Sequence, residues 1–88
     1  MDLEISAEKA AEIISVAFLP LHCGVEVFDF WKSIRFRVFD ENGDHLLRMD
    51  KLVWMDYNSV DGLCSIIEYA RSALVDRGFS LDPWNWPI

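Results

Sequence analysis

The sequence predicts a small α+β domain with the element order α-β-β-β-α, in which three antiparallel strands form a meander and two helices cover one face of the sheet. Apolar residues recur at helical spacing near both ends of the chain, and apolar and charged residues alternate in its middle. The dipeptide Asn42-Gly43, typical of tight hairpin turns, separates the two clearest strand segments. Because a three-stranded sheet needs one covered face for stability, two amphipathic helices complete the arrangement.

Length and charge narrow the class of protein. We expect the 88 residues to form one domain, residues 1–88, with residues 1–5 and 79–88 as terminal segments. A hydrophobic fraction of 52% is too high for a disordered chain. The formal net charge of -7 argues against a general nucleic-acid binder, because such proteins neutralise phosphates with Lys and Arg. The acidic start Met1–Glu4 and the lack of a long apolar run predict a cytoplasmic protein without a signal peptide or membrane span.

The first helix is expected to begin after Ser6, which is a good N-cap residue. Glu8 lies in its first turn, where the helix dipole stabilises a negative charge. Pro20 should end it near Phe18. The apolar residues that fall on one face of this helix are Ala7, Ala10, Ala11, Ile14, Ala17 and Phe18.

Two strands should follow, His22–Phe28 and Ser33–Asp40, joined by Asp29–Lys32. In the first strand, Cys23, Val25 and Val27 alternate with Gly24 and Glu26. In the second, Ile34, Phe36 and Val38 point to one face, and Arg35, Arg37 and Phe39 point to the other.

A type I′ turn at Asn42-Gly43 would fix the register of the second and third strands, because both of its central residues need positive φ. The predicted pairs are Glu41 with Asp44, Val38 with Leu47, Arg37 with Arg48 and Phe36 with Met49. This register places Leu46, Arg48 and Asp50 on the same face as Arg35 and Arg37. The third strand is expected to continue to Met55, and Trp54 joins the arginine face unless a bulge intervenes at Asp50-Lys51.

The second helix is expected between Ser59 as N-cap and Gly78 as the residue that ends it. Its apolar stripe consists of Val60, Leu63, Cys64, Ile67, Ala70 and Leu74. Glu68 and Arg71 form an i,i+3 pair on this helix. The tail Phe79–Ile88 either packs across the body of the domain or serves as a short linear motif.

Two motifs carry a resemblance: Ala17-Phe18-Leu19-Pro20-Leu21 followed by Cys23, and Arg37-Val38-Phe39-Asp40. They resemble a family of short, uncharacterised proteins of pseudomonads, which is catalogued as a domain of unknown function. The similarity runs from about Ile13 to Leu74. It implies a compact, bacterial, cytoplasmic protein, and it implies no catalytic residue or ligand.

No motif in the chain predicts catalysis, a cofactor or a metal. The candidate ligands His22, Cys23, His45 and Cys64 lack zinc-site spacing. Cys64 falls in an apolar stripe, which disfavours a reactive thiolate. Without an export signal, Cys23 and Cys64 are expected to be free thiols, and a disulfide between them stays open. We therefore expect a protein that is not an enzyme.

The arginine face is the main candidate for an interface. Lys32, Arg35, Arg37, Arg48 and Lys51 supply five of the eight positive charges of the chain. Tryptophans outside the core are further candidates, because Trp and Arg dominate binding hot spots. The candidate interface residues are Arg35, Arg37, Phe39, Leu46, Arg48, Trp31, Trp54, Trp84 and Trp86.

The function favoured by the sequence is a small regulatory domain that works by contact with a protein partner or with a second copy of itself. One alternative is a nucleic-acid-linked regulator that stacks bases on the arginine face. Another is an acidic antagonist of the immunity or anti-defence type, which would bind a basic partner through Glu4, Glu8 and Glu12. A purely solvated sheet face is the simplest reading of the same residues.

Overall fold

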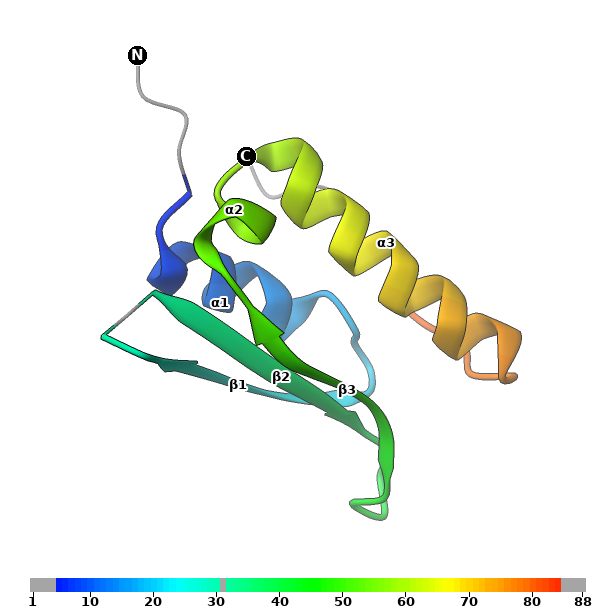
Figure 1. Cartoon of the computed structure of the whole chain (residues 1–88). Helices are drawn as coiled ribbons and strands as arrows, with labels where there is room; N and C mark the ends of the chain where they lie inside the picture. Colours follow the sequence, from blue (N-terminus) through cyan, green and yellow to red (C-terminus); the bar gives the residue numbers. More distant parts are fainter. Residues whose placement is uncertain (1–4, 31, 85–88) are drawn as a thin grey trace.

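The computed structural model describes residues 5–30 and 32–84. The elements in chain order are α1 (Ala7–Val16), β1 (His22–Phe28), β2 (Ser33–Phe39), β3 (His45–Leu52), α2 (Trp54–Tyr57) and α3 (Val60–Asp76). The strands form one antiparallel sheet in the order β1-β2-β3, and the helices lie on one side of it (Figure 1). The predicted α+β meander is confirmed, with the short helix α2 as an addition.

Helix α1 begins as predicted and ends earlier. The Ser6 side chain accepts a hydrogen bond from the Lys9 N–H at 3.1 Å. The helix ends at Val16, two residues before the expected end. Of the predicted face, Ala7, Ala10, Ile14, Ala17 and Phe18 are buried, Ala11 is half-buried, and the unpredicted Ile13 is buried as well.

The core lies between the helices and the inner face of the sheet. Ile34, Phe36 and Val38 of β2 are completely buried, as their alternation predicts. The ring of Phe36 stacks on that of Phe18, with 5.6 Å between the ring centroids. Helix α1 packs over β1 and β2, while α3 packs over β3. The helical layer thus covers one face of all three strands.

The turn between β2 and β3 is not of the predicted type. A type I′ turn requires positive φ at both Asn42 and Gly43, and of these two only Gly43 has it, with a φ of 85°. The Gly43 N–H donates to the Asp40 carbonyl at 3.1 Å, and the Asp40 N–H donates to the Asp44 carbonyl at 3.0 Å. These bonds close a longer loop with glycine in the left-handed position. The predicted pair of Glu41 with Asp44 is therefore wrong.

Beyond the turn, the predicted register is confirmed. The observed pairs are Phe36 with Met49, Arg37 with Arg48, and Val38 with Leu47. The longer loop shifts the strands by one residue, and a bulge restores the register, because Phe39 pairs with His45 and Leu46 becomes the extra residue. A second irregularity follows, at which Ile34 lies opposite Leu52.

The third strand is shorter than predicted. It ends at Leu52, and the residues expected to continue it form α2, so Trp54 lies on a helix and not among the arginines. The Asp56 carboxylate accepts the Val53 N–H at 2.9 Å, which satisfies a donor at the start of this helix. The buried Tyr57 donates its hydroxyl to the Lys32 carbonyl at 2.9 Å. These contacts turn the chain away from the sheet.

Helix α3 has the predicted caps and most of the predicted stripe. The Ser59 hydroxyl accepts the Gly62 N–H at 3.0 Å, and Gly78 follows the helix with a φ of 95°. Leu63, Ile67, Ala70 and Leu74 are buried, Cys64 is half-buried, and Val60 is exposed, contrary to the prediction.

The described part of the tail packs against the body, which decides between the two predicted alternatives as far as residue 84. Phe79, Leu81 and Trp84 pack against the core. The Asp82 N–H donates to the Leu19 carbonyl at 2.7 Å. Arg71 donates to the carbonyls of Ala17 at 2.5 Å and Asp82 at 2.7 Å, in place of its predicted pairing with Glu68.

Candidate functional site: the open face of the sheet

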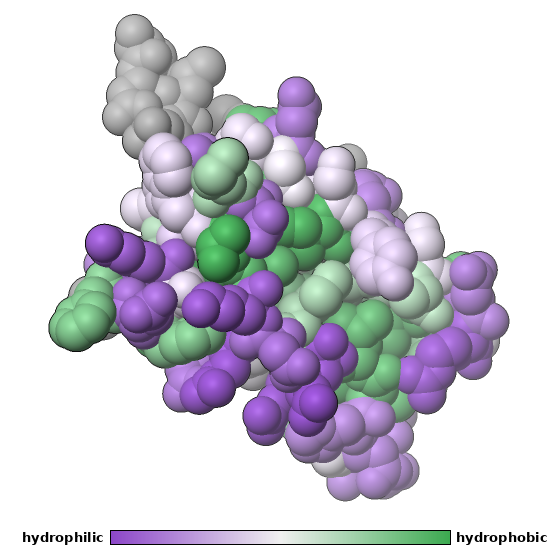
Figure 2. Space-filling view, in the orientation of Figure 1, coloured by the Kyte–Doolittle hydropathy of each residue, from purple (hydrophilic) through white to green (hydrophobic). Residues whose placement is uncertain are grey.

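The side of the sheet turned away from the helices is the candidate site, and we call it the open face. It includes Gly24, Glu26, Arg35, Arg37, Phe39, Arg48 and Asp50. Its charged residues are exposed on all three strands, because they alternate with the buried residues of the inner face. Hydrophilic side chains gather over the strands, and a hydrophobic band lies between β3 and α3 (Figure 2).

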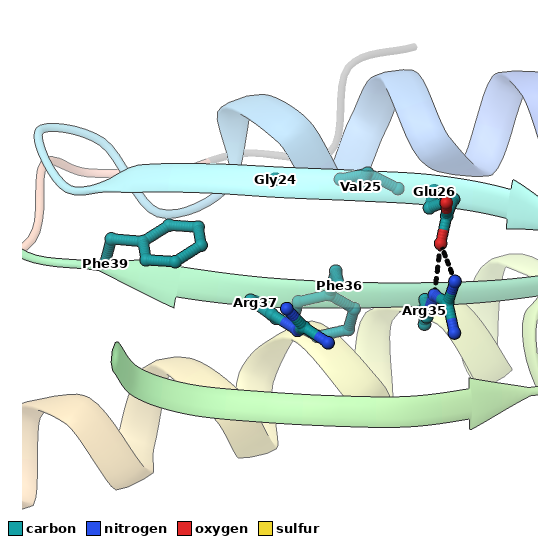
Figure 3. A pocket seen from close by; sticks show the side chains of 7 residues that line it. All are labelled: Gly24, Val25, Glu26, Arg35, Phe36, Arg37 and Phe39. Atoms are coloured by element: carbon teal, nitrogen blue, oxygen red, sulfur yellow. Dashed lines mark hydrogen bonds and ion pairs between the residues drawn. The ribbon is translucent and has the colours of Figure 1, made fainter. Parts of the chain in front are cut away.

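Arg35 is held by two neighbours. The pairing of β1 with β2 places Glu26 directly opposite it, and the two side chains form an ion pair with a hydrogen bond (Figure 3). The Arg35 guanidinium also lies over the ring of Phe28, 4.9 Å from its centroid. Its charge is therefore already matched within the chain.

Arg37 differs from the other two arginines of the open face. Arg48 pairs with Asp50, with 2.9 Å between Nε and Oδ1. Arg37 lies between Arg48 on β3 and Gly24 on β1, and it forms no ion pair or hydrogen bond through its side chain within residues 5–30 and 32–84. Of the three arginines of the open face, Arg37 is thus the one whose charge is unmatched within the described residues.

An aromatic ring borders Arg37. The Phe39 ring lies so close to Gly24 that a Cβ on this glycine would be 3.4 Å from it. The same ring meets His45 edge to face, with 4.8 Å between centroids. Phe39 is half-buried, so part of the ring stays accessible next to the guanidinium of Arg37.

The open face contains a shallow depression of about 410 Å³, which is lined by Gly24, Val25, Glu26, Arg35, Phe36, Arg37 and Phe39. Figure 3 shows Phe39 at one end, the Glu26–Arg35 pair at the other, and Arg37 between them. Gly24 contributes no side chain, which leaves the backbone of β1 accessible there. The depression therefore joins a cation, a ring and accessible backbone, which suits a polypeptide segment better than a small molecule.

The other predicted interface residues lie elsewhere. Leu46 is the extra residue of the bulge and packs in part against the core. Trp54 is 45% exposed on α2, and Trp84 packs against the core. Trp31 and Trp86 lie outside the described residues. Of the predicted set, Arg35, Arg37, Phe39 and Arg48 are brought together.

Phe30 and Arg77 were not among the predicted site residues. Phe30, at the turn between β1 and β2, is 89% exposed and has a φ of 56°, an uncommon backbone conformation for a bulky residue. Arg77, the C-cap of α3, donates to the Leu46 carbonyl and lies over the ring of Phe79. Phe30 had one local signal, because an apolar residue is unusual in the connection Asp29–Lys32. The contacts of Arg77 depend on tertiary structure and have no local signal.

The two cysteines are free thiols, which decides the alternative left open by the sequence. Burial raises the pKa of the Cys23 thiol to about 12. Burial also raises the pKa of Cys64, and the nearby carboxylates of Glu68 and Asp61 add to this. Since the thiolate is the nucleophile, these shifts disfavour a reactive thiolate at either cysteine.

No group of three His, Cys, Asp or Glu side chains converges on a metal position among the described residues. No helix in this part of the chain has the length and apolar character needed to cross a bilayer. On α1, Glu8 and Glu12 are exposed, and Glu12 lies 3.9 Å from Lys9. Glu4, the third predicted member of the acidic stripe, lies outside the described residues.

Comparisons with protein-family models, curated proteins and solved structures give no significant match. The resemblance to a pseudomonad family therefore stays a prediction. Any function must be argued from the open face itself.

Proposed function

We propose that this chain is a non-enzymatic interaction domain that binds an acidic segment of a protein partner on the open face of its sheet. The observation that supports this most is the unmatched guanidinium of Arg37 beside the accessible ring of Phe39. A carboxylate of the partner would pair with Arg37, and apolar atoms next to that carboxylate would cover the ring. Arg and aromatic side chains are the residues that most often dominate such contacts.

The charges of the open face favour a protein over a nucleic acid. Arg35 and Arg48 each have a carboxylate within the chain, namely Glu26 and Asp50. Phosphates would have to displace both carboxylates or lie beside them, and the chain as a whole carries a net charge of -7. One acidic side chain needs only Arg37, so a protein segment with a single well-placed carboxylate satisfies this face.

A test with a defined probe is a short synthetic peptide in which Glu and Phe alternate, titrated into the protein while the backbone amide resonances are recorded. We expect shifts in β2 and at Gly24 that are lost in Arg37→Glu. Lys51→Glu makes the same change in net charge at an exposed residue outside the depression, and it should keep the binding.

The outcomes separate the alternatives. Equal loss in Arg37→Glu and Lys51→Glu would show a general charge effect and contradict a site at Arg37. An absence of shifts with wild-type protein at low salt would also contradict it. Stronger binding of a single-stranded RNA oligonucleotide, lost in Arg37→Glu, would favour the nucleic-acid alternative instead.

A further inference from the structure

The outer edge of β1 is a regular strand with little protection against pairing. All of its residues pair with β2 in unbroken register, from His22 opposite Phe39 to Phe28 opposite Ser33. Its only charged side chain is Glu26. Within residues 5–30 and 32–84, no other segment hydrogen-bonds to this edge. A strand of this kind is a template for pairing with another chain.

The opposite edge of the sheet is protected in three ways. β3 has register irregularities at both ends, and bulges of this kind interrupt pairing. Its middle carries the exposed charges of Arg48, Asp50 and Lys51. The Leu46 carbonyl is bonded to the side chain of Arg77. Edge strands of natural proteins avoid pairing by bulges and charges such as these, so the two edges of one sheet differ in kind.

The inner side chains of β1 are also incompletely covered. Cys23, Val25 and Val27 pack against the core below α1, yet all three are only half-buried. Their counterparts on the central strand, Phe36 and Val38, are completely buried. A neighbouring strand on the outer edge would cover these side chains as β2 is covered by its two neighbours.

We propose that β1 pairs with β1 of a second copy of this chain, antiparallel and centred on Val25, so that the two sheets join into one. The two-fold symmetry places Val25 opposite Val25 of the second copy and Cys23 opposite its Val27. The half-buried apolar side chains then cover one another on the inner side. This inference is independent of the function proposed above.

The charge pattern of β1 suits this register. With Val25 at the centre, Glu26 lies opposite Gly24 of the second copy and not opposite its Glu26. Like charges opposite each other destabilise an antiparallel pair, and this register avoids that repulsion. Gly24 has no side chain and leaves room for the Glu26–Arg35 ion pair, which stays intact on the open face.

Two substitutions at Gly24 test the proposal because they make opposite predictions. In the dimer, residue 24 of each copy lies opposite Glu26 of the other copy. Gly24→Glu therefore creates two pairs of like charge, whereas Gly24→Lys creates two pairs of opposite charge. Within one chain the effects reverse, because residue 24 faces Arg37 across the sheet. If the substitutions act through folding, Gly24→Lys should be the more harmful of the two. If they act through the dimer, Gly24→Glu should be the more harmful. Both variants share the same small steric change against the Phe39 ring.

Sedimentation equilibrium of wild type and both variants would give the dimer dissociation constant of each protein. Gly24→Glu should raise the constant roughly tenfold relative to wild type, and Gly24→Lys should leave it equal or lower it. Amide hydrogen exchange, recorded at a low and a high protein concentration, should show new protection at high concentration in β1 and unchanged exchange in β3.

Three results would overturn the proposal. One is a wild-type monomer at every concentration. Another is a dimer whose concentration-dependent protection falls in β3 or in the helices. The third is an equal change in the dissociation constant for Gly24→Glu and Gly24→Lys. The peptide titration at Arg37 is a separate measurement, so failure of one proposal does not decide the other.

Discussion

The two faces of β2 are built from alternate residues of one strand, and they have opposite properties. Phe36 and Val38 are completely buried below the helices, whereas Arg35 and Arg37 are exposed on the other side. The inner face is a close-packed core without a charged side chain among its buried residues that the structure describes. The outer face carries ion pairs, a half-buried ring and a shallow depression.

Because of this difference, the inner face determines the stability of the fold, whereas the open face contributes little to it. The free energy of folding depends on apolar area removed from water, and most of that area belongs to the inner face. Exposed ion pairs such as Glu26–Arg35 add little to stability, because water screens them. The open face can therefore change its residues, and with them its partner, at small cost to folding.

The largest effect should come from truncation of the core. Phe36→Ala removes a completely buried ring that stacks on Phe18, and we expect a loss of about 3–5 kcal/mol in the free energy of unfolding. Arg37→Ala, one residue further on, should change it by less than about 0.5 kcal/mol. Urea unfolding followed by circular dichroism measures both. Similar losses in the two variants would contradict the division between the faces.

A second prediction compares one glycine from each layer. A Cβ at Gly62 on α3 would lie 2.6 Å from the Asp56 backbone carbonyl, whereas a Cβ at Gly24 would lie 3.4 Å from the edge of the Phe39 ring. Helix propensity alone favours Gly62→Ala by about 1 kcal/mol, and overpacking costs about 1–3 kcal/mol. We expect Gly62→Ala to lower the melting temperature and Gly24→Ala to leave it nearly unchanged. A rise for Gly62→Ala would show that α2 and α3 adjust freely.

Sequence periodicity predicted the strands and the faces because alternation records which side is buried. The register of β2 and β3 was also correct, although the turn type was wrong, because a bulge at Leu46 compensates for the longer loop. Phe36 and Val38 are buried and Leu47 packs against the core on the same side, and this fixes the register more strongly than the turn does.

The end of β3 could not be predicted from the local sequence pattern. Residues 52–55, Leu-Val-Trp-Met, are apolar and suit a strand. Helix α2 forms there because Asp56 accepts the Val53 N–H and Tyr57 bonds the distant Lys32 carbonyl. Likewise, the sequence placed arginines on the open face, but it did not show which of them have partners. That depends on the register of β1 with β2, which puts Glu26 opposite Arg35.

A third prediction concerns the loss of stability at alkaline pH that arises from the thiol of Cys23. This residue lies on the inner side of the edge strand β1. Burial holds the pKa of this thiol at about 12, above its usual value of 9.0. The raised pKa means that the unfolded chain loses the thiol proton first, so stability falls as pH rises from about 9 toward 12. The loss is at most about 1.4 kcal/mol per pH unit.

The comparison that isolates this effect is wild type against Cys23→Ala, measured by urea unfolding from pH 8 to 10.5. All other side chains are the same in the two proteins, so the difference between the two curves reports Cys23. We expect the stability advantage of wild type to shrink above pH 9. A constant difference would mean that the Cys23 thiol is as well solvated in the folded chain as in the unfolded one.

The smallest effect should belong to the ion pair of the open face. A double-mutant cycle of Glu26→Ala and Arg35→Ala should give a coupling free energy of about 0.2–1 kcal/mol, because both side chains are about half exposed. The coupling should decrease further in high salt, which screens exposed charges. The Arg35 contact with the Phe28 ring depends less on salt, so part of the loss in Arg35→Ala should remain. A coupling of several kcal/mol, insensitive to salt, would mean that the open face supports the fold as strongly as the core does, and its residues would then not be free to serve a partner.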